Sequence, residues 1–393
     1  LHLTILPMQR IPTKERPDLS RAAAEHGFEF IDGAGIPYWD ESAYYSFTIR
    51  QIEEELEGPA EDIEHMCFDV VERAVNDEDV LRRLGIAEKF WNYIAESWRN
   101  GEKNLYGRMD LSYDGGGPAK LLEYNADTPT TLYESSVFQW EWLEQAADQG
   151  LVPEGCDQFN DLHDSIVKAF PLLGIKGVLH FACNKDIEDD KGTIDYLEEC
   201  ASEAGLKTAF LPMEDIGIDA RGSFTDLDDR VITTLFKLYP WEWIMDEAFG
   251  EKIPASGARF IEPPWKAILS NKGLLPLMWE MFEGHPNLLP AYFEGDPAAG
   301  ELDSSCVRKP LFSRQGANIE IIKEGQTKAQ NDGPYGEEGH ILQALHPLPE
   351  YSGNYPLIGC WLIASKAVGM CIREDQTMIT GRDARFIPHV ILN

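Results

Sequence analysis

Two short stretches of the chain place polar side chains at two-residue spacing. Glu123, Asn125 and Asp127 alternate along LLEYNAD, and Arg108 and Asp110 alternate along YGRMD. Side chains of a β-strand alternate between the faces of its sheet, so each set would share one face. Carboxylate and amide oxygens suit Mg²⁺, and a neighbouring guanidinium could neutralise charge that develops in phosphoryl or acyl transfer. The same residues could also form a solvated face with a cross-strand Arg–Glu pair, which contributes less than about 1 kcal/mol.

A second candidate concerns phosphate binding. No GxxxxGK[ST] motif occurs, and no GxGxxG motif follows a strand-like run. In VRKPLFSRQGANI, however, Lys309 lies on a predicted strand and precedes a polar loop that contains Gly316. Such a hairpin can cover phosphates with its backbone N–H groups while the strand lysine reaches in, although an ordinary hairpin has the same pattern. Lys272, in SNKG, is by itself typical of surface decoration.

The elements that would position these residues follow from hydrophobic periodicity. Residues 104–127 predict two strands joined by the glycine-rich loop SYDGGGP. The first hundred residues are acidic and predict helices over Glu41–Leu56, Asp62–Val75 and Ile86–Arg99. Further along the chain, 177–182 predicts a strand, 186–205 a helix and 206–212 another strand, which indicates a small parallel β-α-β unit.

The last third of the chain predicts mainly strands. Residues 231–243 indicate a strand that runs into a helix, and 339–345, 357–364 and 368–373 are strand-like. The sequence therefore predicts an α/β (α+β) protein in four parts. These are a mainly helical region over 1–100, a hairpin and helix over 101–150, a small α/β unit over 151–260, and a region of strands over 261–393.

Composition excludes several classes of protein. The 68 acidic residues against 34 basic ones give a net charge of −34, which disfavours nucleic-acid and anionic-membrane partners. No apolar run approaches the length of a membrane span. The seven cysteines form no C-x-x-C pair, so we expect a reduced, cytoplasmic protein. Nothing in the sequence decides whether the chain forms a homo-oligomer.

Taken together and in order, seven segments resemble the synthetase domain of the glutathionylspermidine synthase family, in a stand-alone form. The resemblance covers nearly the whole chain from about residue 100 onward. The segments are RMD at 108–110, LEYNADTPT at 122–130, NKDIEDD at 184–190, EPPWKAILSNKGLLPLMW at 262–279, VRKPLFSRQGANI at 307–319, QALHPLP at 343–349 and GMCIREDQTMIT at 369–380.

This resemblance implies an ATP-grasp-like fold that binds ATP between antiparallel sheets, with the 261–393 region forming much of the nucleotide site. It also implies carbon–nitrogen ligation, in which ATP phosphorylates a peptide carboxylate and an amine attacks the acyl phosphate. The implied Mg²⁺ ligands, for two ions, are Asp110, Glu123 and Asn125, with Arg108 as the catalytic residue that stabilises the transferring group. The implied ATP-binding residues are Arg108, Asp110, Lys272, Lys309, Gln315, Gly316, Gln343, Ala344, Leu345, His346, Arg373, Met378, Ile379 and Thr380.

The acceptor side departs from the family pattern. The family's Ser-Ala-Ser-Cys run is Thr-Pro-Thr-Thr here, beginning at Thr128, and a family threonine that faces glutathione corresponds to Trp243. A family acid that faces the acceptor corresponds to Arg385, whereas Glu188 and Asp189 match the pair that faces the polyamine. No matched segment corresponds to the cysteine amidase of bifunctional members, so amide hydrolysis is not expected. Glutathione and spermidine are therefore models for the substrate classes: a peptide or amino-acid carboxylate, and an amine or polyamine.

Three functions compete at this point. The first is an Mg²⁺- and ATP-dependent amide ligase. The second is an ATP-binding relative whose altered acceptor site no longer supports ligation. The third is an ATP-independent hydrolase that uses Asp110 and Glu123 as a carboxylate pair, which leaves the segments around Lys272 and Lys309 unexplained.

Overall fold

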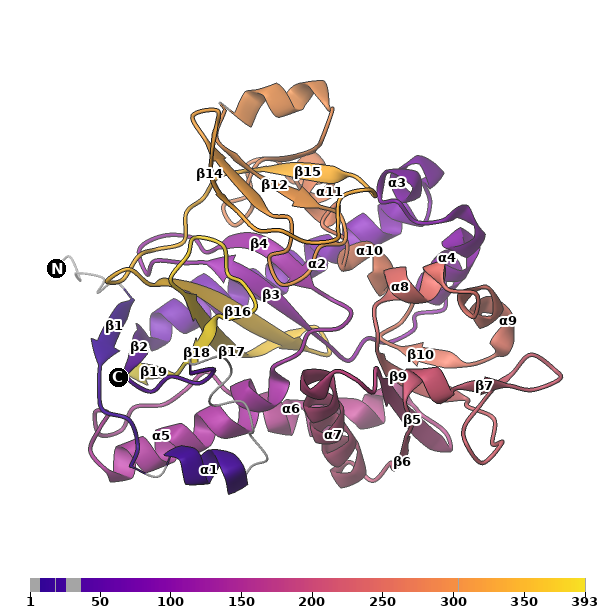
Figure 1. The fold of residues 1–393 in the computed structure, drawn as a ribbon, viewed down its shortest axis with the longest axis horizontal. Coiled ribbons are helices and arrows are strands. Elements are labelled where there is room, and N and C mark those ends of the chain that lie inside the picture. The colour runs from indigo at the N-terminus through magenta and orange to yellow at the C-terminus, as the bar shows by residue number, and fades with distance from the viewer. Residues whose placement is uncertain (1–7, 18, 26–36, 303, 393) are drawn as a thin grey trace.

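A five-stranded antiparallel sheet at the centre of the molecule joins segments that are far apart in the sequence. The computed structural model describes residues 8–17, 19–25, 37–302 and 304–392. Within them, the predicted hairpin over 104–127 is confirmed, and its first strand pairs with a strand near the C-terminus (Figure 1). The strand order is β18 (Arg385–Ile387), β17 (Lys366–Asp375), β16 (Tyr355–Ile363), β3 (Tyr106–Ser112) and β4 (Lys120–Asn125).

The two faces of this central sheet bury different partners. Met109 and Ile358 lie on the face that packs with helix α2 (Gly58–Ala74) in one hydrophobic cluster. On the opposite face, Tyr106 and Trp361 stack at 6.2 Å and join a second cluster with helix α6 (Leu162–Ala169). Arg108 and Asp110 follow Tyr106 on that second face because strand side chains alternate. Part of this face is therefore core, and the adjoining part carries the polar residues.

A second antiparallel sheet lies above the central sheet in the view of Figure 1. It contains the strand that carries Lys309 and the strand that carries Gln343, which are direct neighbours. The order is β11 (Ala291–Phe293), β15 (His340–Ala344), β12 (Cys306–Pro310), β13 (Glu320–Lys323) and β14 (Gln326–Gln330). Two antiparallel sheets thus face one another across the middle of the molecule, as the sequence resemblance implies.

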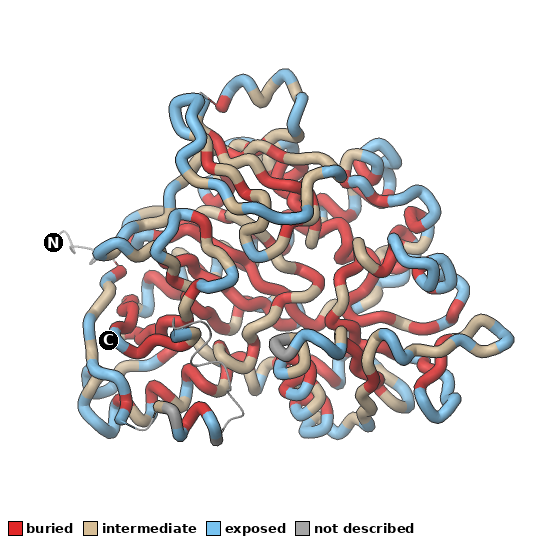
Figure 2. Tube along the Cα trace, in the orientation of Figure 1, coloured by how far each residue is buried: buried red, intermediate tan, exposed pale blue. Residues whose placement is uncertain are grey.

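The predicted β-α-β unit is confirmed and belongs to a parallel sheet of four strands. Helix α7 (Glu188–Glu203) connects the neighbouring strands β5 and β6, and β9 continues into the short helix α8 (Trp241–Asp246). The strand order is β10 (Arg259–Ile261), β9 (Thr234–Leu238), β5 (Val178–Cys183) and β6 (Lys207–Phe210). The tube in Figure 2 is red along most of these strands, because the sheet is covered on both faces.

One predicted helix is wrong. Residues 43–48 of the expected helix Glu41–Leu56 form strand β2 (Ala43–Thr48), which pairs with β1 (Gln9–Pro12) and β19 (His389–Leu392). Tyr44, Tyr45 and Phe47 are all buried, so strand β2 carries apolar residues on both faces. A continuous apolar run matches the spacing of a helix as well as that of a strand, so the spacing does not distinguish the two. The aromatic residues favour a strand once two partners are available. A π-helical turn over Gln51–Glu57 then leads into α2.

The remaining elements are short. Helix α4 begins at Trp91, because a 3₁₀ turn over Glu88–Phe90 occupies the start of the predicted helix Ile86–Arg99. No helix in the described ranges is both long and apolar enough to cross a membrane. The other elements are α1 (Leu19–Glu25), α3 (Glu78–Arg83), α4 (Trp91–Arg99), a π-helical turn (Glu134–Phe138) leading into α5 (Gln139–Asp148), α9 (Ile253–Ser256), α10 (Lys266–Leu269), α11 (Leu274–Met281) and the strand pair β7 (Gly217–Ile218) and β8 (Phe224–Thr225).

Candidate active site

A cavity of about 930 Å³ lies between the two antiparallel sheets and reaches the C-terminal end of β9. Its walls carry most of the residues that the sequence singled out, from β3, β4, β12, β15, β17 and the loops beside them. The predicted residues that line it are Arg108, Asp110, Glu123, Asn125, Thr128, Trp243, Lys309, Gln315, Gly316, Gln343, Ala344, Leu345, His346, Arg373, Met378, Ile379 and Thr380.

Among the predicted residues whose side chains the structure describes, Lys272 alone does not line this cavity. Lys272 lies behind the wall, where its Nζ is 3.1 Å from Glu123 Oε2 and donates to the carbonyl of Ser313 at 2.5 Å. Glu188 and Asp189 begin helix α7, and their side chains lie outside the part of the structure that is described.

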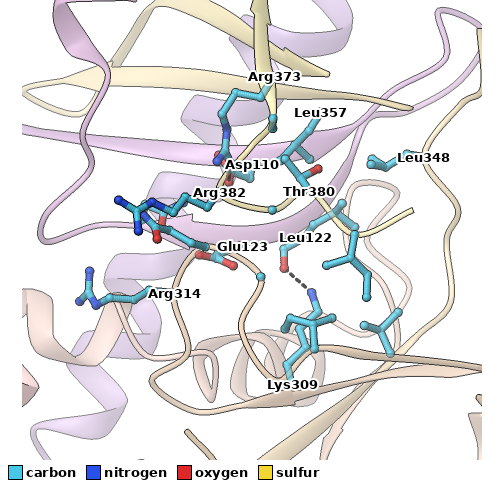
Figure 3. Close-up of a pocket in the computed structure, with 18 of the residues that line it drawn as sticks. Asp110, Leu122, Glu123, Lys309, Arg314, Leu348, Leu357, Arg373, Thr380 and Arg382 are labelled. Carbon is cyan, nitrogen blue, oxygen red and sulfur yellow. Dashed lines mark hydrogen bonds and ion pairs between the residues drawn. The ribbon is translucent and has the colours of Figure 1, made fainter. Parts of the chain in front are cut away.

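Asp110 is held between two arginines on the polar face of the central sheet. Arg108 Nε donates to Asp110 Oδ1 at 2.9 Å. Arg373 Nη2, from β17, donates to Asp110 Oδ2 at 2.6 Å, and Figure 3 shows these last two residues side by side. Burial alone would raise the pKa of Asp110, but the two guanidinium groups outweigh it and hold the pKa below its usual value. Asp110 is therefore an ionised carboxylate with both oxygens engaged.

Glycine at position 359 lets Arg108 lie across the neighbouring strand. A Cβ atom on Gly359 would come within 2.7 Å of Arg108 Cδ and 2.8 Å of Cys371 Sγ. Because residue 359 has no side chain, the Arg108 guanidinium can also donate to the carbonyl of Thr130 at 3.0 Å and lie 5.4 Å from the centre of the Trp361 ring. The loop after β4 and the central sheet together fix the orientation of this guanidinium.

Lys309 reaches into the cavity from β12 of the upper sheet. Its Nζ donates to Gln343 Oε1 at 2.7 Å and to the carbonyl of Leu122 at 2.8 Å, and Figure 3 shows the second bond. Gln343 Nε2 in turn donates to the carbonyl of Leu121 at 3.0 Å, so the two side chains bridge the sheets. Burial lowers the pKa of Lys309 to about 8, with Glu123 acting in the opposite direction.

Four buried polar atoms at this site have no hydrogen-bond partner in the described part of the chain. Buried polar groups are nearly always paired in folded proteins, so such a group of exceptions indicates that ligand atoms complete the site. Asn125 lies across the strands from Arg108, as Glu123 lies across from Asp110. The four atoms are Asn125 Nδ2, Ser313 Oγ, Arg373 Nε and Thr380 Oγ1.

The donor set fits a hard cation. Asp110 and Glu123 are direct cross-strand neighbours, and Asn125 adds an amide oxygen on the same face, while its unpaired Nδ2 can donate to a ligand oxygen but cannot bind a cation. No group of three His, Cys, Asp or Glu side chains with metal-binding geometry occurs in the described ranges, so an amide or substrate oxygens would have to complete the coordination of any ion held here. Mg²⁺ is often bound in this way, by one or two carboxylates together with phosphate oxygens and water.

The loop after β12 forms a wall that the sequence analysis only partly identified. Arg314 donates to Glu242 Oε1 at 2.7 Å and to Thr128 Oγ1 at 2.8 Å, and its guanidinium lies 5.8 Å from the Trp243 ring. Neither Arg314 nor Glu242 was among the predicted site residues. They lie 72 positions apart in the chain, so no local spacing or motif relates them.

The third member of the opening triplet has a different role. Strand β4 ends at Asn125, so the two-residue alternation stops before Asp127. Asp127 accepts a 2.6 Å hydrogen bond from Lys237 Nζ on β9 and a 2.8 Å bond from the backbone N–H of Trp241, which begins α8. The expectation that Asp127 shares the face of Glu123 and Asn125 is wrong, and the residue connects the central sheet to the parallel sheet instead.

Arg385 also has partners that explain its charge. Its guanidinium donates to Glu374 Oε1 at 2.5 Å and to Asp40 Oδ2 at 2.9 Å. It faces a second cavity of about 820 Å³ on the other side of the loop that contains Arg314 and Gln315. In this chain Arg385 is therefore part of an ion-pair cluster.

Comparison with known proteins identifies the family of this chain. The family model described as glutathionylspermidine synthase pre-ATP-grasp matches residues 10–392. A Haemophilus influenzae protein with the provisional name acid–amine ligase is 38% identical over 388 residues, which are 95% of this chain and 97% of that protein. A trypanothione synthetase of Crithidia fasciculata is 29% identical, over 80% of this chain and 51% of its own length.

Two more relatives extend the comparison. The bifunctional glutathionylspermidine synthetase/amidase of Escherichia coli is 24% identical over 90% of this chain and 60% of its own length, so the chain spans only part of that protein. The apo structure of a glutathione synthetase-like effector from Globodera pallida has a TM-score of 0.53 at 11% identity, covering 96% of this chain and 98% of the other. That likeness shows a shared fold. With a family model that matches nearly every residue and a full-length relative above 30% identity, the chain belongs to the glutathionylspermidine synthase pre-ATP-grasp family.

Proposed function

We propose that this chain is an ATP- and Mg²⁺-dependent carbon–nitrogen ligase that joins the carboxylate of a small peptide or amino acid to an amine. One observation carries the proposal. A single cavity brings the oxygen donors of β3 and β4 together with Lys309 of the upper sheet and Arg373 of β17. Phosphoryl transfer depends mainly on positioning and charge neutralisation, and this arrangement supplies both.

The nucleotide half of the site has the clearer assignment. In this proposal Asp110, Glu123 and Asn125 hold two Mg²⁺ ions. The positive charge of these ions would neutralise the negative charge of the phosphate oxygens. Lys309, with the backbone of Gln315 and Gly316, contacts the phosphates, and Lys272 joins them by moving from behind the cavity wall, away from its partners Glu123 and Ser313. Residues 343–346 line the adenine, and Arg373 with residues 378–380 completes the nucleotide site, consistent with their place on the cavity wall.

The proposed reaction has two steps. An oxygen of the substrate carboxylate attacks the γ-phosphorus of ATP, ADP leaves, and an acyl phosphate forms. The nitrogen of the amine then attacks the acyl carbon, inorganic phosphate leaves with the bonding electrons, and the nitrogen loses a proton to give the amide. Arg108, fixed by Asp110 and Thr130, contacts the transferring group and stabilises its charge.

The acceptor half contains the specificity of this chain. Thr128 and Trp243 line the same cavity, next to Arg314. Glu188 and Asp189 begin helix α7, and the residues on either side of them in the chain, Ile187 and Asp190, line the cavity as well. The names of the relatives indicate glutathione-like peptides and polyamines as the substrate classes to test first.

The seven cysteines are all free thiols, which supports a reducing, cytoplasmic location.

The two competing functions make different predictions. An ATP-binding relative without ligase activity would bind nucleotide but release no phosphate with any acid–amine pair. A carboxylate-pair hydrolase needs one protonated carboxyl with a raised pKa. The lowered pKa of Asp110 and the ion pair between Glu123 and Lys272 weigh against that function.

Thermal unfolding with Mg²⁺–ADP or Mg²⁺–ATP tests the proposal first. A ligand at about one hundred times its Kd stabilises the folded state by about 2.7 kcal/mol, which should raise the unfolding midpoint by several degrees. The shift should need Mg²⁺ and should shrink in Asn125→Ala and Lys309→Ala. Phosphate release should then appear only when both an acid and an amine are supplied. No shift at millimolar nucleotide would refute the ligase function.

A further inference from the structure

Glu374 is a buried carboxylate outside the proposed reaction that contacts three other side chains. It is fully buried and lies on β17 directly after Arg373. Arg10 on β1 donates to both of its oxygens, at 2.7 and 3.0 Å, and Tyr45 on β2 donates its hydroxyl at 2.6 Å. Arg385 on β18 donates a further bond at 2.5 Å. Two guanidinium groups and a phenol therefore hold one carboxylate.

These contacts form where two sheets meet. Arg10 and Tyr45 are direct cross-strand neighbours in the sheet of β1, β2 and β19. Glu374 and Arg385 are direct neighbours across the β17–β18 pair of the central sheet. Arg385 is further fixed by Asp40, whose other oxygen accepts the backbone N–H of Ser42 at 2.8 Å. We call Arg10, Tyr45, Glu374 and Arg385 the Glu374 clamp.

The Glu374 clamp closes the base of a loop that enters the candidate active site. Residues 376–384 connect β17 to β18, and Met378, Ile379 and Thr380 from this loop line the main cavity. Asp375 organises the loop internally by accepting the backbone N–H groups of Thr377 and Gly381, at 2.9 and 3.0 Å. Since the loop is short and internally bonded, its position depends on how its two ends are held.

The same clamp fixes the strand position of Arg373. Arg373 precedes Glu374 and points to the other side, where it bonds Asp110 at 2.6 Å. A strand whose residue 374 is locked by three partners leaves little freedom at residue 373. Arg10 and Tyr45 line neither cavity, so they can influence the site only through Glu374 and the strands that carry it.

We propose that the Glu374 clamp is a positioning device for the nucleotide site, which sets the place of the 376–384 loop and of Arg373. The inference rests on the proposed function, because it assigns these strands to nucleotide binding. Its members are positioning residues and touch no substrate. Through them, the packing of the three-stranded sheet β1–β2–β19 influences the affinity for nucleotide.

Substitution of Arg10 is the sharpest test, because Arg10 is remote from both cavities. Arg10→Met removes both of its bonds to Glu374, and Arg10→Lys restores the charge with fewer bonds. The matched control is Arg16→Met. Arg16 belongs to the same N-terminal segment and forms an ion pair with Glu41 at 2.7 Å that is more deeply buried than that of Arg10, but Glu41 lies on no strand that lines the cavity. Removing either pair should lower the unfolding midpoint.

The measurement is the Kd of Mg²⁺–ADP by titration calorimetry, below the unfolding midpoint of every variant. We expect Arg10→Met to raise Kd about tenfold, Arg10→Lys to recover part of the loss, and Arg16→Met to change Kd by less than about twofold. If Arg10→Met does not fold, the milder variant Tyr45→Phe takes its place, and we expect it to raise Kd by about two- to threefold. Equal Kd values for wild type and the clamp variants, or an equal loss in Arg16→Met, would overturn the clamp. Absence of binding by the wild-type protein would instead refute the proposed function, and the clamp with it.

Discussion

At the scale of single residues, the candidate site is a set of charges that are already paired. Asp110 contacts Arg108 and Arg373, and Glu123 contacts Lys272. The two arginines hold the pKa of Asp110 below its usual value, so this carboxylate is ionised at neutral pH, which suits metal binding and opposes a general-acid role. The sequence predicted the strand-borne part of this set because alternation relates neighbours two apart. It could not predict contacts such as that of Arg314 with Glu242, which depend on how distant segments fold together.

Lys309 gives a pH prediction at this scale. Its pKa in the free protein is about 8, below the ordinary lysine value, because the amine is buried. A bound phosphate favours the charged amine, so nucleotide binding should take up protons near pH 8, and affinity should fall as pH rises through that value. Calorimetry in buffers of different ionisation enthalpy would measure the proton uptake. Lys309→Arg, which stays charged, should lose the slope between about pH 7 and pH 10. An unchanged slope in that variant would assign the titration to another group.

At the scale of elements, the structure brings two loops together over the cavity. The loop after β12 and the 376–384 loop meet where Gly316 approaches Thr380. The strands beside them were predictable from alternation, since 357–364 overlaps β16 (Tyr355–Ile363) and 368–373 lies within β17 (Lys366–Asp375). Strand β2 was not predictable, because its apolar run is buried on both sides and only its partners distinguish a strand from a helix.

Gly316→Ala should separate the two loops. A Cβ atom there would lie 2.7 Å from the carbonyl oxygen of Thr380, and the φ of +72° adds backbone strain. We expect nucleotide affinity to fall about tenfold or more. Gly325→Ala is the control, since its φ of +71° imposes the same strain while nothing lies within 4 Å. If both variants lose affinity equally, backbone strain rather than loop contact is the cause.

At the scale of the whole molecule, buried charges join the sheets to one another. Lys237 on β9 and Asp127 after β4 form a fully buried pair at 2.6 Å between the parallel and the central sheets. Burial raises the pKa of Asp127 and lowers that of Lys237, so each charge depends on the other. The fold class and the β-α-β unit followed from periodicity and from family resemblance. The Lys237–Asp127 junction could not be predicted in this way, because the alternation of polar and apolar residues along LLEYNAD continues through Asp127, whereas strand β4 ends at Asn125.

Lys237→Met should therefore destabilise the protein by about 3–5 kcal/mol, because it leaves the Asp127 charge buried and unpaired. The double variant Asp127→Asn/Lys237→Met should recover most of that loss, since asparagine can still accept the N–H of Trp241 without carrying a charge. Urea unfolding of the single and double variants measures both effects. If the double variant is no more stable than Lys237→Met, the cost comes from lost packing rather than from the unpaired charge.

The order of strands in the central sheet has a consequence for how the protein is made. β3 (Tyr106–Ser112) and β4 (Lys120–Asn125) leave the ribosome long before their neighbour β16 (Tyr355–Ile363). Until then, the edge of β3 that later pairs with β16 has no partner, and exposed strand edges promote aggregation. Such long-range pairing also slows folding. Nascent chains that end before β16 should accordingly depend on chaperones, whereas the β5–α7–β6 unit can form while synthesis continues.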